Sequence, residues 1–85
     1  MIVRWTDRFT QAYEKLPLEI QKRFDEKIKL FKSNPKHPSL NIHRVKRAFA
    51  IWEAYVTKSY RWTFQFIEGG VKLRVIGTHN ILKNP

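Results

Sequence analysis

The sequence predicts an α+β fold: a two-helix hairpin packed on one face of a small antiparallel β-sheet, in the order β-α-α-β-β-β(β). Three observations lead to this prediction. Apolar residues recur every three to four positions in the first part of the chain, and the period changes to two after Ser39. A cluster of helix-breaking residues separates the two parts. With 85 residues the chain can build one modest core, so we expect a single domain over residues 1–85.

The first strand and the first helix follow each other without a loop. Ile2 to Trp5 is short and rich in strand-forming residues, which predicts a strand. Thr6 and Asp7 are suited to cap a helix that begins there, and Pro17 ends it. The apolar positions of this helix are spaced by three and four and therefore line one face: Phe9, Ala12, Tyr13 and Leu16.

A second helix is expected directly after Pro17, which suits a first helical turn. Its apolar stripe is predicted to be buried and consists of Leu18, Ile20, Phe24, Ile28 and Phe31. The segment from Ser33 to Ser39 collects Ser, Asn and Pro residues, so it closes the helical part as a turn.

Four strands are expected after this turn. They cover Leu40 to Arg47, Ile51 to Thr57, Tyr60 to Ile67 and Val71 to Gly77. The turns between them fall at residues 58–59 and 68–70, where two adjacent glycines can adopt positive φ at little steric cost.

Alternate residues of a strand point to opposite faces of the sheet. The set predicted to face the helices is Trp52, Ala54, Val56, Trp62, Phe64 and Phe66. The set predicted to form an open polar face is Glu53, Tyr55, Thr57, Arg61, Thr63 and Gln65.

The charge balance narrows the class of partner. Seventeen Lys and Arg residues against seven Asp and Glu give a formal charge of +10, which attracts nucleic acid, an anionic membrane surface or an acidic protein. The absence of cysteine excludes a disulfide framework and a thiolate metal site. No apolar run approaches the ~20 residues that cross a bilayer, and the first residues lack an apolar signal region, so we expect a cytoplasmic location.

The polar face carries the residue types that cleave RNA through its own 2′-hydroxyl. That reaction needs a base, an acid and cations that stabilise the charged phosphorane. The candidate catalytic residues are Arg61, His79 and Glu53, and the candidate substrate-binding residues are His43, Arg44, Lys46, Arg47, Tyr55 and Lys58. Each also has an ordinary interpretation, since Glu53 suits a cross-strand ion pair and Tyr55 suits simple packing. The histidines lie far apart in sequence and no cluster of carboxylates accompanies them, so the sequence does not predict a metal site.

Four short elements resemble the RelE/ParE superfamily of toxins from toxin–antitoxin modules. They read L-x-x-H-x-x-K from Leu40, W-x-x-x-V from Trp52, Y-R-x-x-F from Tyr60 and G-T-H from Gly77, and they occur in the order of the family. The helical hairpin also fits, so the likeness covers nearly the whole chain.

The resemblance implies a toxin that cleaves mRNA on the ribosome without a metal ion or cofactor, and that is held inactive by a cognate antitoxin protein. It assigns Arg61 to stabilisation of the phosphate and His79 to acid–base chemistry, as in the RelE/YafQ-like branch. Glu53 departs from the family pattern, because some RelE-like toxins place a basic residue on the neighbouring strand at this position. Residues 81–85 lack the late Arg and Tyr of RelE itself, which favours the histidine-dependent variant.

Two other functions remain open at this point. A ParE-like protein would inhibit DNA gyrase by binding, with no nuclease chemistry, because one fold can support several functions. A basic RNA- or ribosome-binding domain without catalysis would carry the same positive charge.

Overall fold

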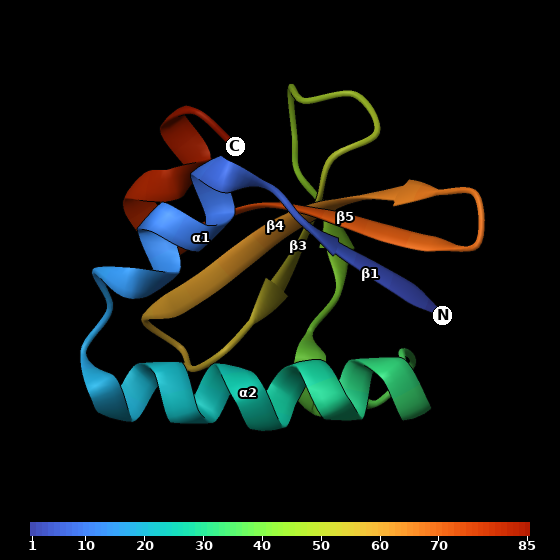
Figure 1. The fold of residues 1–85 in the computed structure, drawn as a ribbon. Helices are drawn as coiled ribbons and strands as arrows, with labels where there is room; N and C mark the ends of the chain where they lie inside the picture. Colours follow the sequence, from blue (N-terminus) through green and yellow to red (C-terminus); the bar gives the residue numbers. More distant parts are fainter.

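A five-stranded sheet forms the centre of the molecule, with strand order β1-β5-β4-β3-β2 (Figure 1). The computed structural model describes residues 1–85. The elements along the chain are β1 Ile2–Trp5, α1 Asp7–Glu14, α2 Leu18–Ser33, the 3-10 helix η1 Pro38–Leu40, β2 His43–Arg44, β3 Trp52–Tyr55, β4 Tyr60–Ile67, β5 Gly70–Thr78 and the 3-10 helix η2 His79–Lys83. The predicted α+β class with two helices on a small sheet is confirmed.

One strand pair differs from the purely antiparallel sheet that the sequence predicts. Strands β2 to β5 follow one another through turns and pair antiparallel, but β1 joins the free edge of β5 in parallel. No turn connects β1 to β5, so local turn signals cannot set the direction of this pair. The two strands approach closely at Gly70, which is paired with Ile2.

Both predicted helices form, and the signals at their ends explain why. The Thr6 hydroxyl accepts a hydrogen bond from the Phe9 backbone N–H at 3.1 Å, which caps α1. Residues 15–17 separate the helices, and the Gln21 side chain donates to the Tyr13 and Leu16 carbonyl oxygens across this turn. These hydrogen bonds fix the start of α2 against the end of α1.

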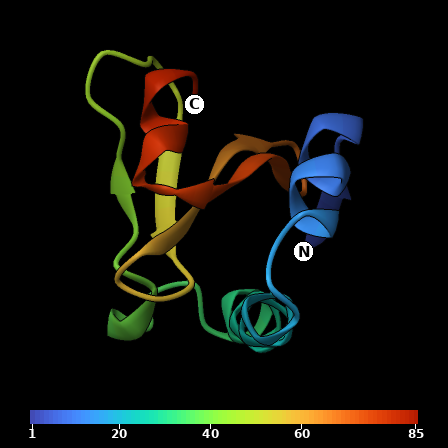
Figure 2. The same cartoon turned by 90° about the vertical axis from the view of Figure 1, so that its left-hand side faces the viewer.

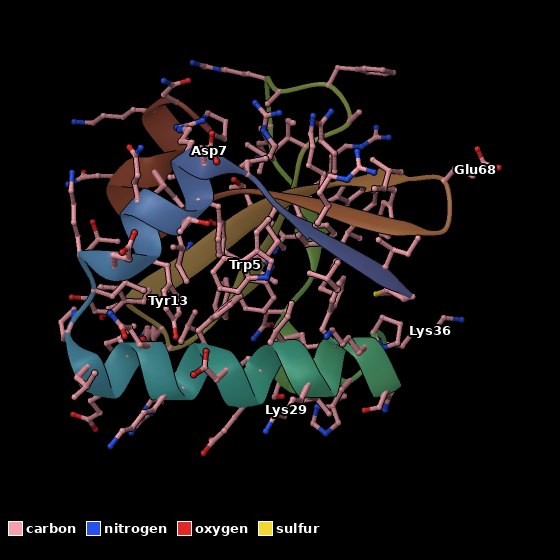
Figure 3. The ribbon with its side chains drawn as sticks, viewed as in Figure 1. Trp5, Asp7, Tyr13, Lys29, Lys36 and Glu68 are labelled. Atoms are coloured by element: carbon pink, nitrogen blue, oxygen red, sulfur yellow. The ribbon has the colours of Figure 1, made fainter.

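Aromatic side chains from both helices and the sheet share one core. Phe9 of α1, together with Phe24 and Phe31 of α2, is fully buried, as are Trp62 and Phe64 of β4. The rings meet edge to face, with centroids 5.2 Å apart for Phe24–Trp62 and for Phe31–Phe64. In Figure 3, Trp5 and Tyr13 point into the space between α1 and α2, where their rings lie 5.2 Å apart.

Three details of the predicted burial and strand lengths are wrong. Leu18, in the first turn of α2, is 67% exposed, and Phe66, although it packs edge-on against Trp52, is 57% exposed. The strand predicted from Leu40 to Arg47 shortens to β2, because η1 occupies its beginning and Asn41 takes a left-handed conformation.

The polar face of the sheet is partly covered, which corrects the prediction of a fully open face. Figures 1 and 2 show η2 on the side of the sheet opposite α2. The Pro85 carbonyl oxygen accepts hydrogen bonds from the Thr63 hydroxyl and from Arg74 Nε, each at 3.0 Å, and these bonds tie the segment after β5 to the sheet. Thr63 is 0% exposed, and Glu53, which lies opposite Thr63 on β3, is 1% exposed.

None of the helices has the length and the apolar character that crossing a lipid bilayer requires.

Replacing Gly70 by alanine is expected to weaken the β1–β5 pair. The added Cβ would lie 1.8 Å from the Ile2 carbonyl oxygen, so the backbone must shift. We expect a loss of about 2–3 kcal/mol in the free energy of unfolding, measured by urea denaturation. Gly77→Ala is the matched control, because its Cβ would meet only the Ile81 side chain, at 2.9 Å, and should cost clearly less. Equal losses for both variants would contradict the close approach.

Tyr13 should make stability fall at alkaline pH. Burial raises its pKa above the ordinary value of 10.0, and the hydrogen bond and negative charge of Asp25 raise this pKa further. The folded protein thus keeps the phenol proton where the unfolded chain loses it, so stability is full below pH 10.0 and declines as pH rises toward the folded pKa. Urea unfolding at a series of alkaline pH values should show a smaller decline for Tyr13→Phe than for wild type. Identical declines would contradict the raised pKa.

Candidate functional site

An open depression of about 280 Å³ lies where β2, β3 and β4 meet the start of η2. Its lining residues are His43, Arg44, Val45, Lys46, Glu53, Arg61, His79 and Leu82. The structure thus brings together six of the nine residues singled out in the sequence. Of the other three, Tyr55 and Lys58 contact Arg61 through the Tyr55 ring and the Lys58 carbonyl oxygen, and Arg47 follows Lys46 in the chain.

The carboxylate of Glu53 is buried in the floor of the depression. Strand pairing sets Glu53 opposite His43 on β2 and opposite Thr63 on β4. Its Oε1 lies 2.6 Å from His43 Nε2 and 3.5 Å from the Arg61 guanidinium, whereas Oε2 has no hydrogen-bond partner. A buried carboxylate is costly without partners, so His43 and Arg61 are held where they are by this charge.

His43 has both ring nitrogens engaged. Nδ1 lies 2.7 Å from the Asn41 carbonyl oxygen, which can only accept, so Nδ1 carries a proton. At 2.6 Å, Nε2 and the Oε1 of Glu53 must also have a proton between them. The ring is half exposed, so this pair presents a held proton at the wall of the depression.

The Arg61 side chain is fixed from several directions. Its guanidinium stacks on the Tyr55 ring, 4.2 Å from the centroid. The NH1 group donates to His79 Nδ1 at 3.2 Å, and NH2 donates to the Lys58 carbonyl oxygen at 3.3 Å. Only 16% of the side chain is exposed, so Arg61 reaches the depression with one edge of its guanidinium.

His79 is the more available of the two histidines. It follows directly after β5, whose last residues pair with β4, so Gly77 lies opposite Arg61. Because a guanidinium can only donate, His79 Nδ1 accepts the bond from Arg61, and in the neutral ring the proton is on Nε2. His79 is exposed, and Nε2 makes no hydrogen bond within the chain.

The rim of the depression carries exposed cations. Arg44 lies over the Trp52 ring, 5.6 Å from its centroid, which holds its charge beside the depression. Lys46 and Arg47 are exposed on the loop that follows β2. In the floor, Glu53 offsets the charge of Arg61. An anion would therefore meet cations first at the rim.

Two features of the site were not anticipated from the sequence. The apolar wall residues Val45 and Leu82 carry no chemical signal, and the pairing of His43 with Glu53 becomes visible only once the register of β2 on β3 is known. No group of three or more His, Asp or Glu side chains comes together in a way that could hold a metal ion.

No protein-family model and no curated protein sequence matches this chain. Solved structures match its fold. YafQ from E. coli strain BL21(DE3) has a TM-score of 0.74 and 13% identity, covering 95% of this chain and 96% of that chain. The YoeB/ParE toxin from Agrobacterium tumefaciens has a TM-score of 0.74 and 16% identity, covering 93% and 99%. A chain of the RelB–RelE antitoxin–toxin complex from Methanococcus jannaschii has a TM-score of 0.76 and 13% identity, covering 95% of each.

These likenesses extend over nearly the full length of both partners, so the predicted RelE/ParE-like fold is confirmed. At such low identity they concern the fold alone.

Replacing Glu53 by glutamine is expected to destabilise the protein, because the charge of Arg61 would lose its buried partner and His43 its shared proton. We expect a loss of about 2–4 kcal/mol in the free energy of unfolding, measured by urea denaturation. The matched control is Glu19→Gln, which removes an exposed carboxylate that lies 3.7 Å from Arg23 on the same helix. Its cost should stay below about 0.5 kcal/mol. If both variants cost the same, Glu53 does not organise the site.

Proposed function

We propose that this chain, which has the fold of the RelE/ParE-superfamily toxins, is the toxin of a toxin–antitoxin pair and inhibits translation by cleaving mRNA on the ribosome without a metal ion. The observation that carries the proposal is the contact between Arg61 and His79 at the mouth of a cation-rimmed depression. A guanidinium that stabilises the charged phosphorane and an imidazole that accepts a proton are groups that RNA cleavage through the 2′-hydroxyl requires.

The charge of the molecule supports RNA as the substrate. A net charge of +10 on 85 residues draws a phosphate backbone to the surface, and binding releases its counterions. The exposed cations Arg44 and Lys46 line the depression and Arg47 follows them in the chain, so this segment can hold phosphates next to the reacting one.

The proposed reaction begins when the reacting phosphate takes hydrogen bonds from Arg61 NH1. This frees His79 Nδ1, whose lone pair then accepts the proton of the RNA 2′-hydroxyl. The 2′-oxygen attacks phosphorus, and the bond from phosphorus to the 5′-oxygen breaks. The leaving oxygen takes up the proton held between His43 and Glu53. The products are a 2′,3′-cyclic phosphate and a 5′-hydroxyl, with no other reactant needed.

Glu53 acts in this scheme as a positioning residue. With 1% of its side chain exposed, its carboxylate works through His43 and Arg61 and does not touch the substrate. This role differs from that of the catalytic residue for which the sequence made Glu53 a candidate.

A cognate antitoxin protein is the proposed partner. Similar folds occur in complexes named for a toxin and its antitoxin, such as DinJ–YafQ from E. coli and RelE–RelB from Pyrococcus horikoshii. An antitoxin with an acidic segment would neutralise the rim cations and close access to the depression. Such a pair is proposed to act in the cytoplasm, where ribosomes and mRNA are found.

Two observations keep other functions in view. One structural neighbour is named as a YoeB/ParE toxin, which agrees with a ParE-like inhibitor of DNA gyrase. The engagement of both nitrogens of His43 agrees with a basic RNA- or ribosome-binding domain that does not cleave. Neither alternative accounts for a histidine held by the guanidinium of an arginine beside the rim cations.

Alanine at Arg61 and at His79 should abolish cleavage. Induced expression in a bacterial host, with growth followed and mRNA 5′ ends mapped, is expected to give arrest and new ends with wild type. Removal of the group that takes the proton should lower cleavage about 10²- to 10⁴-fold.

The matched controls are His37→Ala, a histidine whose ring bonds only Ser39, and Arg23→Ala, an exposed helix residue; both should behave as wild type. Growth arrest with intact mRNA would overturn the nuclease in favour of gyrase inhibition. Absence of growth arrest with wild type as well as with the variants would favour a binding domain.

A further inference from the structure

The loop of residues 46–50 between β2 and β3 carries an aromatic side chain that the site described so far does not use. Phe49 is 90% exposed, the highest value of any large apolar residue in the chain. The loop extends away from the sheet on the same side as η2 (Figures 1 and 2). Burying such a ring would ordinarily stabilise a fold, so its exposure calls for a partner.

The loop is built to hold this position. Its base is closed by the Val45 backbone N–H, which donates to the Ile51 carbonyl oxygen at 2.9 Å, and both residues are buried. Arg47 and Ala50 have φ values of 68° and 63°, a left-handed conformation that residues other than glycine rarely adopt. The fold thus accepts two strained residues beside Phe49, and the ring stays outside.

The surroundings of the ring are cationic. Arg44, which lines the depression, precedes the loop, and Lys46, which also lines it, lies within the loop together with Arg47. Residues 38–52 contain no Asp or Glu. The neighbours Ala48 and Ala50 are small, and Phe49 is the one large exposed apolar residue of the loop, so the loop does not itself form a broad apolar patch of the kind that docks another protein. A single exposed aromatic among cations fits a single-stranded nucleic acid, whose bases stack and whose phosphates bind the cations.

Tyr55, a candidate substrate-binding residue from the sequence, is not free to stack on a base. One face of the Tyr55 ring is occupied by the Arg61 guanidinium, and the His43 ring meets it edge-on, with centroids 6.0 Å apart. Phe49 has no aromatic neighbour of this kind and no cation over its face.

We propose that Phe49 is a stacking platform for one base of a single-stranded RNA whose phosphates contact Arg44 and Lys46. This inference rests on RNA being the substrate in the function proposed above, and it adds a base-binding position at a distance from the reacting phosphate. Stacking on an aromatic ring tolerates any base, so the platform supplies affinity and placement of the strand more than sequence choice.

The test is equilibrium binding of a fluorescent single-stranded oligoribonucleotide that carries 2′-O-methyl groups and therefore cannot be cleaved. Phe49→Ala should weaken binding about tenfold, since loss of one base–aromatic stack has that effect. Phe49→Leu, which keeps an apolar side chain but loses the ring, should weaken it similarly, and Phe49→Trp should retain it. Ile2→Ala, which trims another exposed apolar residue, should leave affinity unchanged.

Two further measurements distinguish a contribution of stacking from one of charge: the salt dependence of RNA affinity and the affinity for oligonucleotides that lack one base. Phe49→Ala should lower affinity without changing the dependence of log affinity on log salt, whereas Lys46→Ala should reduce that slope by about one. On a set of oligonucleotides with one abasic position each, wild type should lose affinity at a single position. Phe49→Ala should show no further loss at that position.

The outcomes distinguish this proposal from the function on which it rests. Equal RNA affinity of wild type, Phe49→Ala and Phe49→Trp, with cleavage intact, would overturn the stacking platform alone. Unchanged RNA affinity together with a shift from dimer to monomer for Phe49→Ala in sedimentation would make the loop a contact between copies of the chain, and would also overturn it. Absence of any salt-dependent RNA binding by wild type would overturn both proposals.

Discussion

The arrangement of the site depends on one buried charge, the carboxylate of Glu53. A carboxylate removed from water must be paired, and here its partners come from two neighbouring strands, His43 on β2 and Arg61 on β4. Arg61 in turn bonds His79 at the start of η2. The charge therefore fixes, through two steps, the position of a histidine that lies 26 residues away in sequence.

Periodicity was sufficient to predict most of the fold, but not what covers each face of the sheet. The strand predicted from Tyr60 to Ile67 agrees with β4 at both ends, and the Thr6 cap begins α1 as expected. Alternation shows which residues share a face, yet Thr63 is buried because a segment far along the chain folds back to bond it. Such a contact has no local signal, and the parallel direction of β1 has none for the same reason.

The site could be predicted in its residues more than in their roles. Residue type and the resemblance to the toxin superfamily singled out Arg61 and His79, and the two side chains are in contact. Alternation along the strand predicts an exposed Glu53, whereas its side chain is 1% exposed and its carboxylate lies against His43 of β2 and Arg61 of β4. The exposure of Phe49 could not be predicted, because an apolar residue in an apolar run is usually buried. The left-handed φ of Arg47 and Ala50 could not be predicted either, because residues other than glycine rarely adopt this conformation.

The proposed cleavage of RNA through the 2′-hydroxyl of the RNA itself can be tested with a ribosome-bound mRNA whose cleavage position has been mapped. One 2′-deoxy nucleotide is placed immediately before the scissile phosphate, and cleavage by the purified protein is compared with that of the unmodified mRNA. The account predicts that the substituted mRNA is bound as well as the original but is not cut at this position, and that the cut original ends in a 2′,3′-cyclic phosphate. Cleavage of the deoxy-substituted bond at an unchanged rate would contradict it.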